Sequence, residues 1–238
     1  VDHSRYADSR WYTGSGIYRD VWLIAAPEIH LAQWGTGWYA TSLTDRQATI
    51  AVDMEVQKHI VTREKLELSA TLYDAAGKQV AQRRTRVSDG KEGITKETLT
   101  LKVTKPHRWN LNDPYLYTLK AELLSNGKRI DGCETKVGLR TLDFDPNKGF
   151  ALNGNWMKVK GVCLHHDAGV LGAVVPPEVW ERRLNNLKEI GVNAIRMSHN
   201  PHAPIVYDLC DQLGLLVMDE ASDEWEFPKR KWIKGWNK

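Results

Sequence analysis

The 238-residue sequence predicts two kinds of fold in succession, an immunoglobulin-like β-sandwich followed by the first three strands and two helices of a (β/α)8 TIM barrel. From about residue 27 to 140, apolar residues alternate with polar ones at period two, as in half-buried strands. From about residue 141, strand-like and helix-like segments take turns, which is typical of a parallel α/β domain. A complete barrel needs eight strand–helix units and roughly 250 residues, so we expect only its opening here.

Residues 1–26 form a separate block, which we interpret as the C-terminal tail of a preceding β-sandwich. Gly14 and Gly16 make a permissive loop, and residues 20–24 have the composition of a strand. A single strand does not fold alone, so we expect this block to complete a domain that lies upstream.

Residues 27–140 hold the predicted sandwich. The alternating apolar positions are Ile50, Val52, Met54 and Val56, then Leu66, Leu68, Ala70 and Leu72, then Leu99, Leu101 and Val103, then Tyr117, Leu119, Ala121 and Leu123. Glycine-containing turn signals fall between these runs at residues 76–78, 89–91 and 126–128. Short strands at such near-regular spacing indicate an immunoglobulin-type sandwich. No catalytic constellation stands out in this segment, so we expect its role to be structural.

Residues 141–238 hold the predicted start of the barrel. An apolar run through Gly161 and Cys163 predicts the first strand, and it stops at two histidines. Prolines at 176 and 177 begin a helix, because proline suits the first helical turn, and Gly191 ends it. Residues 192–197 form the next predicted strand, residues 204–213 the next helix, and residues 215–218 a third strand.

Polar, titratable residues follow each of these three strands, where a barrel enzyme builds its active face. His165 follows the first strand, His199 the second, and Asp219 and Glu220 the third. His165 and His166 are adjacent, so on an extended segment only one of them can face the barrel axis. For His199 a core histidine bonded to backbone is the alternative, and we favour a functional role because the strand end is followed by an Asn-Pro turn.

Charged residues of this region need partners. Arg196 lies within the second strand, and an unpaired buried charge is heavily penalised. We therefore expect an ion pair with Asp219 or Glu220, and direct contact with a substrate is the alternative. After the third strand the acidic residues are Glu220, Asp223, Glu224 and Glu226. Paired carboxylates suit glycoside hydrolysis or a divalent cation, whereas solvated loop charges are equally compatible with this spacing.

Composition narrows the range of functions. The net charge of +3 is spread along the chain, and no nucleic-acid-binding motif is present, so we expect no nucleic-acid partner. No stretch approaches the roughly 20 apolar residues of a membrane span. Three widely spaced cysteines fit neither a disulfide framework nor a metal site, and we expect them to be buried free thiols. Consecutive His165, His166 and Asp167 match no zinc pattern.

Residues 193–201 read NAIRMSHNP, followed by Tyr-Asp at 207–208 and Asp-Glu at 219–220. These motifs, in this order, resemble glycoside hydrolase family 2. Residues 9–12 and 14–19, reading SRWY and GSGIYR, resemble the end of that family's N-terminal sugar-binding sandwich. The immunoglobulin-like domain is matched by residues 109–111 and 113–117, and the entry to the barrel by residues 138–140, 149–154 and 160–162. The resemblance implies three domains, at residues 1–26, 27–140 and 141–238.

The family consists of exo-acting retaining glycosidases, and the SRWY and LHHD segments resemble bacterial β-galactosidases. The resemblance implies that His165 and His199 hydrogen-bond sugar hydroxyls and that Asp8 reaches the sugar from the preceding domain. Arg196, Asp219 and Glu220 would support the site. The resemblance also allows a magnesium or sodium ion in the full-length enzyme, with Glu224 as a ligand. The second ligand in the family is a histidine, whereas this chain has Glu226.

The resemblance places both reacting glutamates on the fourth and seventh barrel strands. We therefore expect no catalytic acid/base or nucleophile in this chain, and no activity from the chain alone. The implied function is hydrolysis of terminal β-galactosides, with a carbohydrate as partner and a homo-oligomer left open. β-Glucuronidase or β-mannosidase specificity, or a non-catalytic carbohydrate-binding or scaffold module, are the alternatives. Residues 1–4 show no export signal, so the bacterial cytoplasm and periplasm both stay open.

Overall fold

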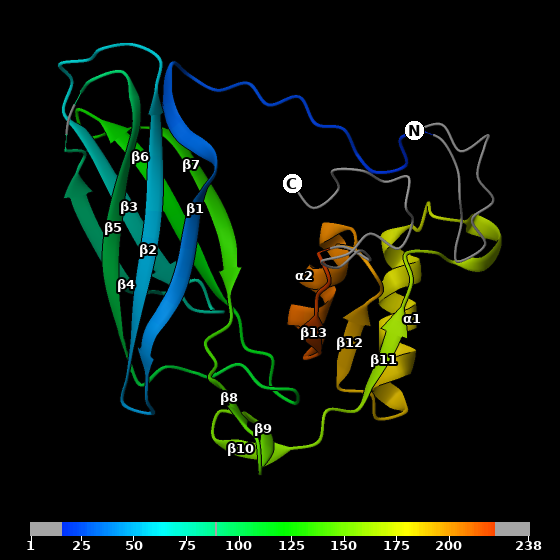
Figure 1. Cartoon of the computed structure of the whole chain (residues 1–238). Helices are drawn as coiled ribbons and strands as arrows, with labels where there is room; N and C mark the ends of the chain where they lie inside the picture. The colour runs from blue at the N-terminus through cyan, green and yellow to red at the C-terminus, as the bar shows by residue number, and fades with distance from the viewer. Residues whose placement is uncertain (1–15, 89, 222–238) are drawn as a thin grey trace. The chain divides into compact units, whose positions relative to one another are not determined.

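The computed structural model describes residues 16–88 and 90–221 (Figure 1). Contacts within the chain divide these residues into two compact units. One unit runs from Leu23 to Trp156, and the other combines the described residues before Leu23 with those from Met157 onward. The domain boundaries expected from the sequence, at residues 26 and 140, stay predictions.

The first unit is a sandwich of seven antiparallel strands in two sheets. One sheet has the order β1-β2-β5, with β1 at Ile29–Leu43, β2 at Gln47–Lys58 and β5 at Gly93–Thr104. The other has the order β4-β3-β6-β7, with β3 at Leu66–Tyr73, β4 at Gln79–Arg86, β6 at Tyr117–Ser125 and β7 at Lys128–Val137. This architecture confirms the predicted immunoglobulin-like sandwich.

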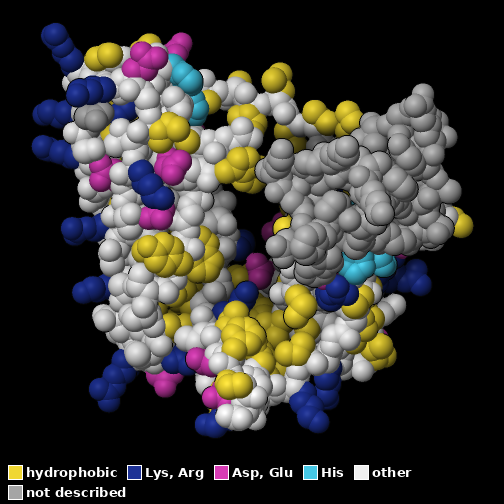
Figure 2. All heavy atoms as spheres, viewed as in Figure 1, with side chains coloured by type: hydrophobic (Ala, Val, Ile, Leu, Met, Phe, Trp, Pro, Cys, Tyr) yellow, Lys and Arg dark blue, Asp and Glu magenta, His cyan; other side chains and the backbone are white. Residues whose placement is uncertain are grey.

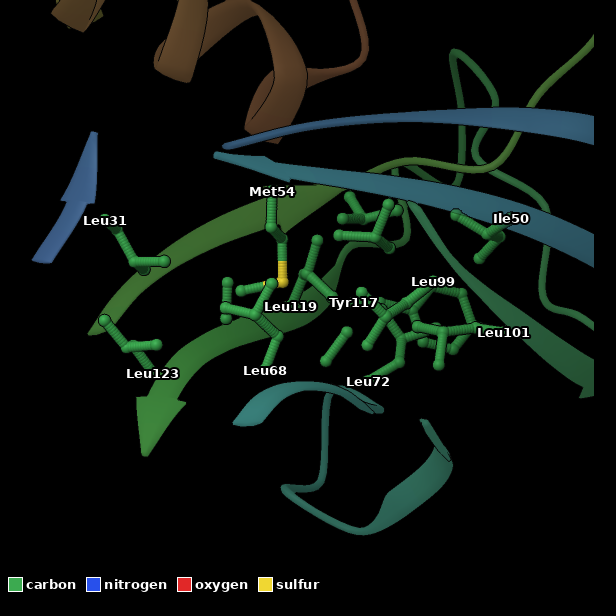
Figure 3. Close-up of a cluster of buried hydrophobic side chains, with 14 of the residues drawn as sticks. Leu31, Ile50, Met54, Leu68, Leu72, Leu99, Leu101, Tyr117, Leu119 and Leu123 are labelled. Carbon is green, nitrogen blue, oxygen red and sulfur yellow. The ribbon is translucent and has the colours of Figure 1, made fainter. Parts of the chain in front are cut away.

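The predicted alternation places the core of this sandwich correctly. Every apolar position named above on β2, β3, β5 and β6 is buried, and the same residues make up one hydrophobic cluster (Figure 3). On β2 and β5, Val52 lies opposite Leu99, and on β3 and β6, Leu68 lies opposite Leu123. Period-two spacing therefore directs one face of each strand inward, as the pleat of a strand requires.

Strand β1 escaped the sequence interpretation because a bulge breaks its alternation. Pairing with β2 shifts between Leu31, opposite Val56, and Thr36, opposite Met54. Gly35 lies in this bulge, where an added Cβ atom would meet Glu55 Cβ at 2.8 Å. Extra residues of this kind move the following side chains to the other face and hide a strand from pattern analysis.

The second unit holds three parallel strands in the order β11-β12-β13, at Gly161–Leu164, Ala194–Met197 and Leu216–Met218. The helices α1 (Pro177–Glu189) and α2 (Pro204–Leu213) follow β11 and β12, and a short 3-10 helix η1 occupies Gly169–Leu171. Trp180 and Leu184 of α1 pack in one core with Ile195 and Met197 of β12. Two strand–helix units and a third strand confirm the predicted opening of a TIM barrel.

Three short strands follow the seven sandwich strands in the sequence, before β11, and were not predicted. They are β8 (Leu142–Asp145), β9 (Gly149–Leu152) and β10 (Asn155–Met157), in the order β10-β9-β8. The contact pattern groups the sheet, up to Trp156, with the sandwich unit. Strands of three or four residues show too little alternation to be read from a pattern.

Two expectations about local structure were wrong. Residues 20–24 form no strand. A strand needs a hydrogen-bonded neighbour, and these residues pair with none of the described strands. Of the three free cysteines only Cys210 is buried, whereas Cys133 on β7 and Cys163 on β11 are exposed. Burial raises the pKa of the Cys210 thiol to about 12.

On the visible face of the sandwich, lysine and arginine side chains are scattered along its length and do not gather in one patch (Figure 2). Within the described residues, no helix has both the length and the apolar character needed to cross a bilayer.

Candidate functional site

Three strand ends bring the candidate site together. Strands β11, β12 and β13 are parallel neighbours, with Cys163 opposite Arg196 and Arg196 opposite Met218. Their carboxyl ends therefore meet at one edge of the sheet. His165, His199 and Glu220 each follow one of these ends, which is where the sequence placed them.

Glu220 accepts hydrogen bonds from two side chains. His199 Nδ1 lies 2.6 Å from Glu220 Oε2, and the Arg196 guanidinium forms an ion pair with Glu220 Oε1. The Glu220 side chain is only 12% exposed, so this carboxylate is largely screened from water by its partners. The arginine pairs with Glu220 and not with Asp219, which were the two partners considered from the sequence.

The charge state of Glu220 follows from these contacts. Burial raises the pKa of its carboxyl group, but the hydrogen bond from His199 and the charge of Arg196 outweigh burial. The net result is a pKa below the usual range, so Glu220 is ionised at neutral pH. A carboxylate on Nδ1 keeps the proton on that nitrogen and fixes the orientation of the His199 ring.

Arg196 also contacts a thiol. Its Nη1 lies 3.3 Å from Cys163 Sγ, and the pKa of this thiol is lowered, first by that hydrogen bond and then by one to Ser198. The alternation of side chains along each strand could have predicted this contact, because Cys163 and Arg196 are paired on adjacent strands and lie on the same face of the sheet. The sequence interpretation had treated Cys163 only as a buried thiol.

The two adjacent histidines meet different neighbours. The His165 ring packs edge-on against His199, with centroids 5.5 Å apart at 85°. The His166 ring lies 5.5 Å from Trp180 and 5.2 Å from His202, next to the helical layer. Burial, followed by the nearby charge of Arg19, lowers the pKa of His166. The structure therefore brings His165, and not His166, together with His199.

Asp219 joins the site through Tyr207, which the sequence interpretation had not assigned a role. The Tyr207 hydroxyl donates to Asp219 Oδ1 at 2.8 Å, and the same oxygen accepts the Glu220 N–H at 3.0 Å. Burial and the hydrogen bond to Asp219 raise the pKa of Tyr207 to about 12. Asp219 thus links helix α2 to the backbone that carries Glu220.

Asp8 and Glu224, together with Asp223 and Glu226, lie outside the described residues. Among residues 16–88 and 90–221, no group of three histidine, cysteine, aspartate or glutamate side chains is arranged to hold a metal ion. The donors present at the site are instead two imidazoles and a carboxylate already paired with Arg196. This set suits hydrogen bonds to neutral hydroxyl groups better than it suits a cation.

An immunoglobulin-like sandwich followed by the opening of a TIM barrel, with imidazole and carboxylate groups at the strand ends, defines the class of multidomain glycoside hydrolases. Two family models support this assignment. The model for glycosyl hydrolases family 2 matches residues 36–140, and the one for that family's TIM barrel domain matches residues 146–227. The chain belongs to glycoside hydrolase family 2.

Known proteins of this family resemble the chain over most of its length. It is 43% identical to the β-galactosidase BoGH2A of Bacteroides ovatus, over 96% of this chain and 27% of that protein. It is 32% identical to a β-glucuronidase of Bacteroides fragilis, over 86% of this chain and 30% of that protein. A crystal structure of a family 2 member from Bacteroides cellulosilyticus matches with a TM-score of 0.88 at 38% identity, over 94% and 29%. The chain thus spans under a third of the length of each relative.

Proposed function

We propose that the complete protein is a retaining exo-glycosidase that hydrolyses terminal β-galactosides in oligo- or polysaccharides. The observation that carries the proposal is the Glu220-bound His199 imidazole, packed edge-on against His165 at the ends of the first barrel strands. Because the chain spans 27% of the matched β-galactosidase, the proposal concerns the complete protein.

The two imidazoles hold the sugar in this proposal. His199 is held by Glu220 at Nδ1, so its ring has a fixed direction before substrate arrives. Hydrogen bonds to sugar hydroxyls that strengthen in the transition state lower the barrier to glycoside hydrolysis.

Glu220 takes a supporting role and is not one of the reacting groups. Retaining hydrolysis needs a nucleophile and an acid/base about 5–5.5 Å apart. Glu220 already serves Arg196 and His199, so it is neither free to attack the anomeric carbon nor protonated to act as an acid. The resemblance to family 2 assigns the reacting glutamates to later barrel strands.

A galactoside is favoured over a glucuronide by charge as well as by similarity. The relative named as a β-galactosidase is 43% identical, against 32% for the β-glucuronidase of Bacteroides fragilis. A glucuronide carries a carboxylate that needs a cation at the site. Arg196, whose Nη2 lies 3.4 Å from His199 Nδ1, is already neutralised by Glu220.

Hydrolysis of matched chromogenic substrates tests the proposal. We expect the complete protein to cleave p-nitrophenyl β-galactoside with a kcat/KM at least about tenfold above the β-glucuronide and β-mannoside, as different sugar contacts allow. Proton NMR of the first product should show the β-anomer, since the reaction retains configuration. Preference for the glucuronide, or inversion at the anomeric carbon, would contradict the proposal. Sugar binding without hydrolysis of any of the three substrates would favour a binding module.

The role of Glu220 has its own matched test. Replacing Glu220→Gln keeps the shape but removes the charge that orients His199 and balances Arg196. We expect kcat/KM for the galactoside to fall by about tenfold or more. Glu189→Gln, at an exposed position at the end of helix α1, is the control and should leave kcat/KM unchanged.

A further inference from the structure

A single peptide group, the one joining Pro201 to His202, is held on both of its polar atoms. The Pro201 carbonyl oxygen accepts a hydrogen bond from Arg19 Nη2 at 2.6 Å. The His202 N–H donates to the Tyr207 hydroxyl at 3.0 Å. This peptide group lies in the turn that follows His199, two residues along the chain.

The two side chains come from distant parts of the sequence. Arg19 lies 182 residues before Pro201, whereas Tyr207 belongs to helix α2. The Tyr207 hydroxyl is itself fixed by Asp219, next to Glu220. The turn is therefore tied to the same backbone segment that carries the partner of His199.

Arg19 and its neighbour Tyr18 also contact the loop after strand β11. The Tyr18 ring lies 5.6 Å from the His166 ring, and the Arg19 guanidinium lies 5.6 Å from the Tyr18 ring centroid. Residues 18 and 19 thus contact both loops that carry the paired histidines. Burial keeps the nearby His166 and His202 neutral at pH 7, so no imidazolium repels the guanidinium.

We propose that Arg19 and Tyr207 are positioning residues, which clamp the Pro201–His202 peptide so that the His199 imidazole meets the sugar in one orientation. The inference rests on the proposed function. Rotation of this peptide would move the backbone of the short turn and tilt the ring away from its sugar contact. Displacements of about 1 Å at an active site cost on the order of a hundredfold in rate.

Kinetics of four variants of the complete protein test the clamp. We expect Arg19→Ala and Tyr207→Phe each to lower kcat/KM for the galactoside by about ten- to a hundredfold, mostly in kcat. Arg19→Lys, which keeps a cationic donor, should recover part of the loss, and added guanidinium ion should partly restore Arg19→Ala. The double variant Arg19→Ala/Tyr207→Phe should lose less than the product of the single losses, because both act on one peptide.

The control is Arg182→Ala, since Arg182 is an exposed arginine of helix α1 in the same unit, and the variant should leave kcat/KM unchanged. Wild-type protein without glycosidase activity would overturn the proposed function. Active wild-type protein with wild-type kcat/KM in folded Arg19→Ala and Tyr207→Phe would overturn the clamp alone, as would losses that multiply. If Arg19→Ala fails to fold, Arg19→Lys and Tyr207→Phe decide in the same way.

Discussion

At the scale of single residues, several side chains of the site share the same partner. Glu220 binds both Arg196 and His199, and Arg196 also contacts Cys163. Such sharing holds each side chain in one rotamer, because moving any one of them breaks two contacts. Histidines in the region divide accordingly, with His199 held by a carboxylate and His202 buried at 2% exposure beside Trp180.

The burial of His202 predicts sensitivity to acid. Burial, then the neighbouring His166, lowers the pKa of His202 from 6.5 to about 4. Below pH 6.5 the unfolded chain gains a proton on this imidazole that the folded chain does not, so stability is full above pH 6.5 and is lost as pH falls towards 4. The difference amounts to about 3 kcal/mol. Urea unfolding should show His202→Gln losing correspondingly less stability between pH 7 and 4.

His59→Gln is the matched control, because His59 is exposed in the sandwich unit. Its acid sensitivity should equal that of the wild type. Equal pH dependence in wild type and His202→Gln would mean that the buried imidazole does not resist protonation.

At the scale of elements, prolines and glycines set where strands and helices begin and end. Pro177 begins α1 and Pro204 begins α2, while Gly214 ends α2 with a φ of 73°. Between β6 and β7 a two-residue hairpin places both Asn126 and Gly127 at positive φ, 49° and 82°. This is the backbone of a type I′ turn, for which Asn-Gly is the preferred pair.

The hairpin predicts that a methyl group added at Gly127 destabilises the sandwich. We expect Gly127→Ala to lower the free energy of unfolding of the sandwich by about 1–2 kcal/mol, because alanine is strained at positive φ. Its added Cβ meets no neighbour within 4 Å, so strain is the whole effect. Gly37→Ala on β1 also meets nothing but has no positive φ, and it should be neutral or stabilising. Equal losses in chemical denaturation of the two variants would refute the assignment to strain.

At the scale of the whole molecule, the described residues form two separate hydrophobic cores. One contains residues from six strands of the sandwich, and the other is centred on Trp180, Ile195 and Met197. The two clusters share no residue. Each unit therefore has its own source of stability.

Core substitutions should consequently act on one unit each. Leu68→Ala, in the sandwich, should lower the free energy of unfolding of that unit by about 2–5 kcal/mol, and Trp180→Ala should lower that of the other by about 3–5 kcal/mol. Hydrogen exchange followed residue by residue can assign each loss. Leu68→Ala that speeds exchange equally in both units would show that they unfold as one.

The sandwich and the helices could be predicted because their signals are local. Alternation at Ile50, Val52 and Met54 identifies a strand without knowledge of its partner, and the ends of helix α2 follow from a proline and a glycine. Strand β1 was missed for the opposite reason, since the bulge around Gly35 and a second register shift between Ala40 and Ser42 each change the face on which the following side chains lie. Residues 20–24 were wrongly given a strand because composition alone does not supply a neighbour to pair with.

The sequence by itself determined the family, the order of the two folds and the presence of His165, His199 and Glu220 at strand ends. Only the tertiary structure decided which carboxylate Arg196 pairs with, which of two adjacent histidines meets His199, and that Arg19 reaches Pro201. The physical reason is range. Strand and helix patterns depend on residues a few positions apart, whereas these contacts depend on sheet register and on packing between residues up to 182 positions apart.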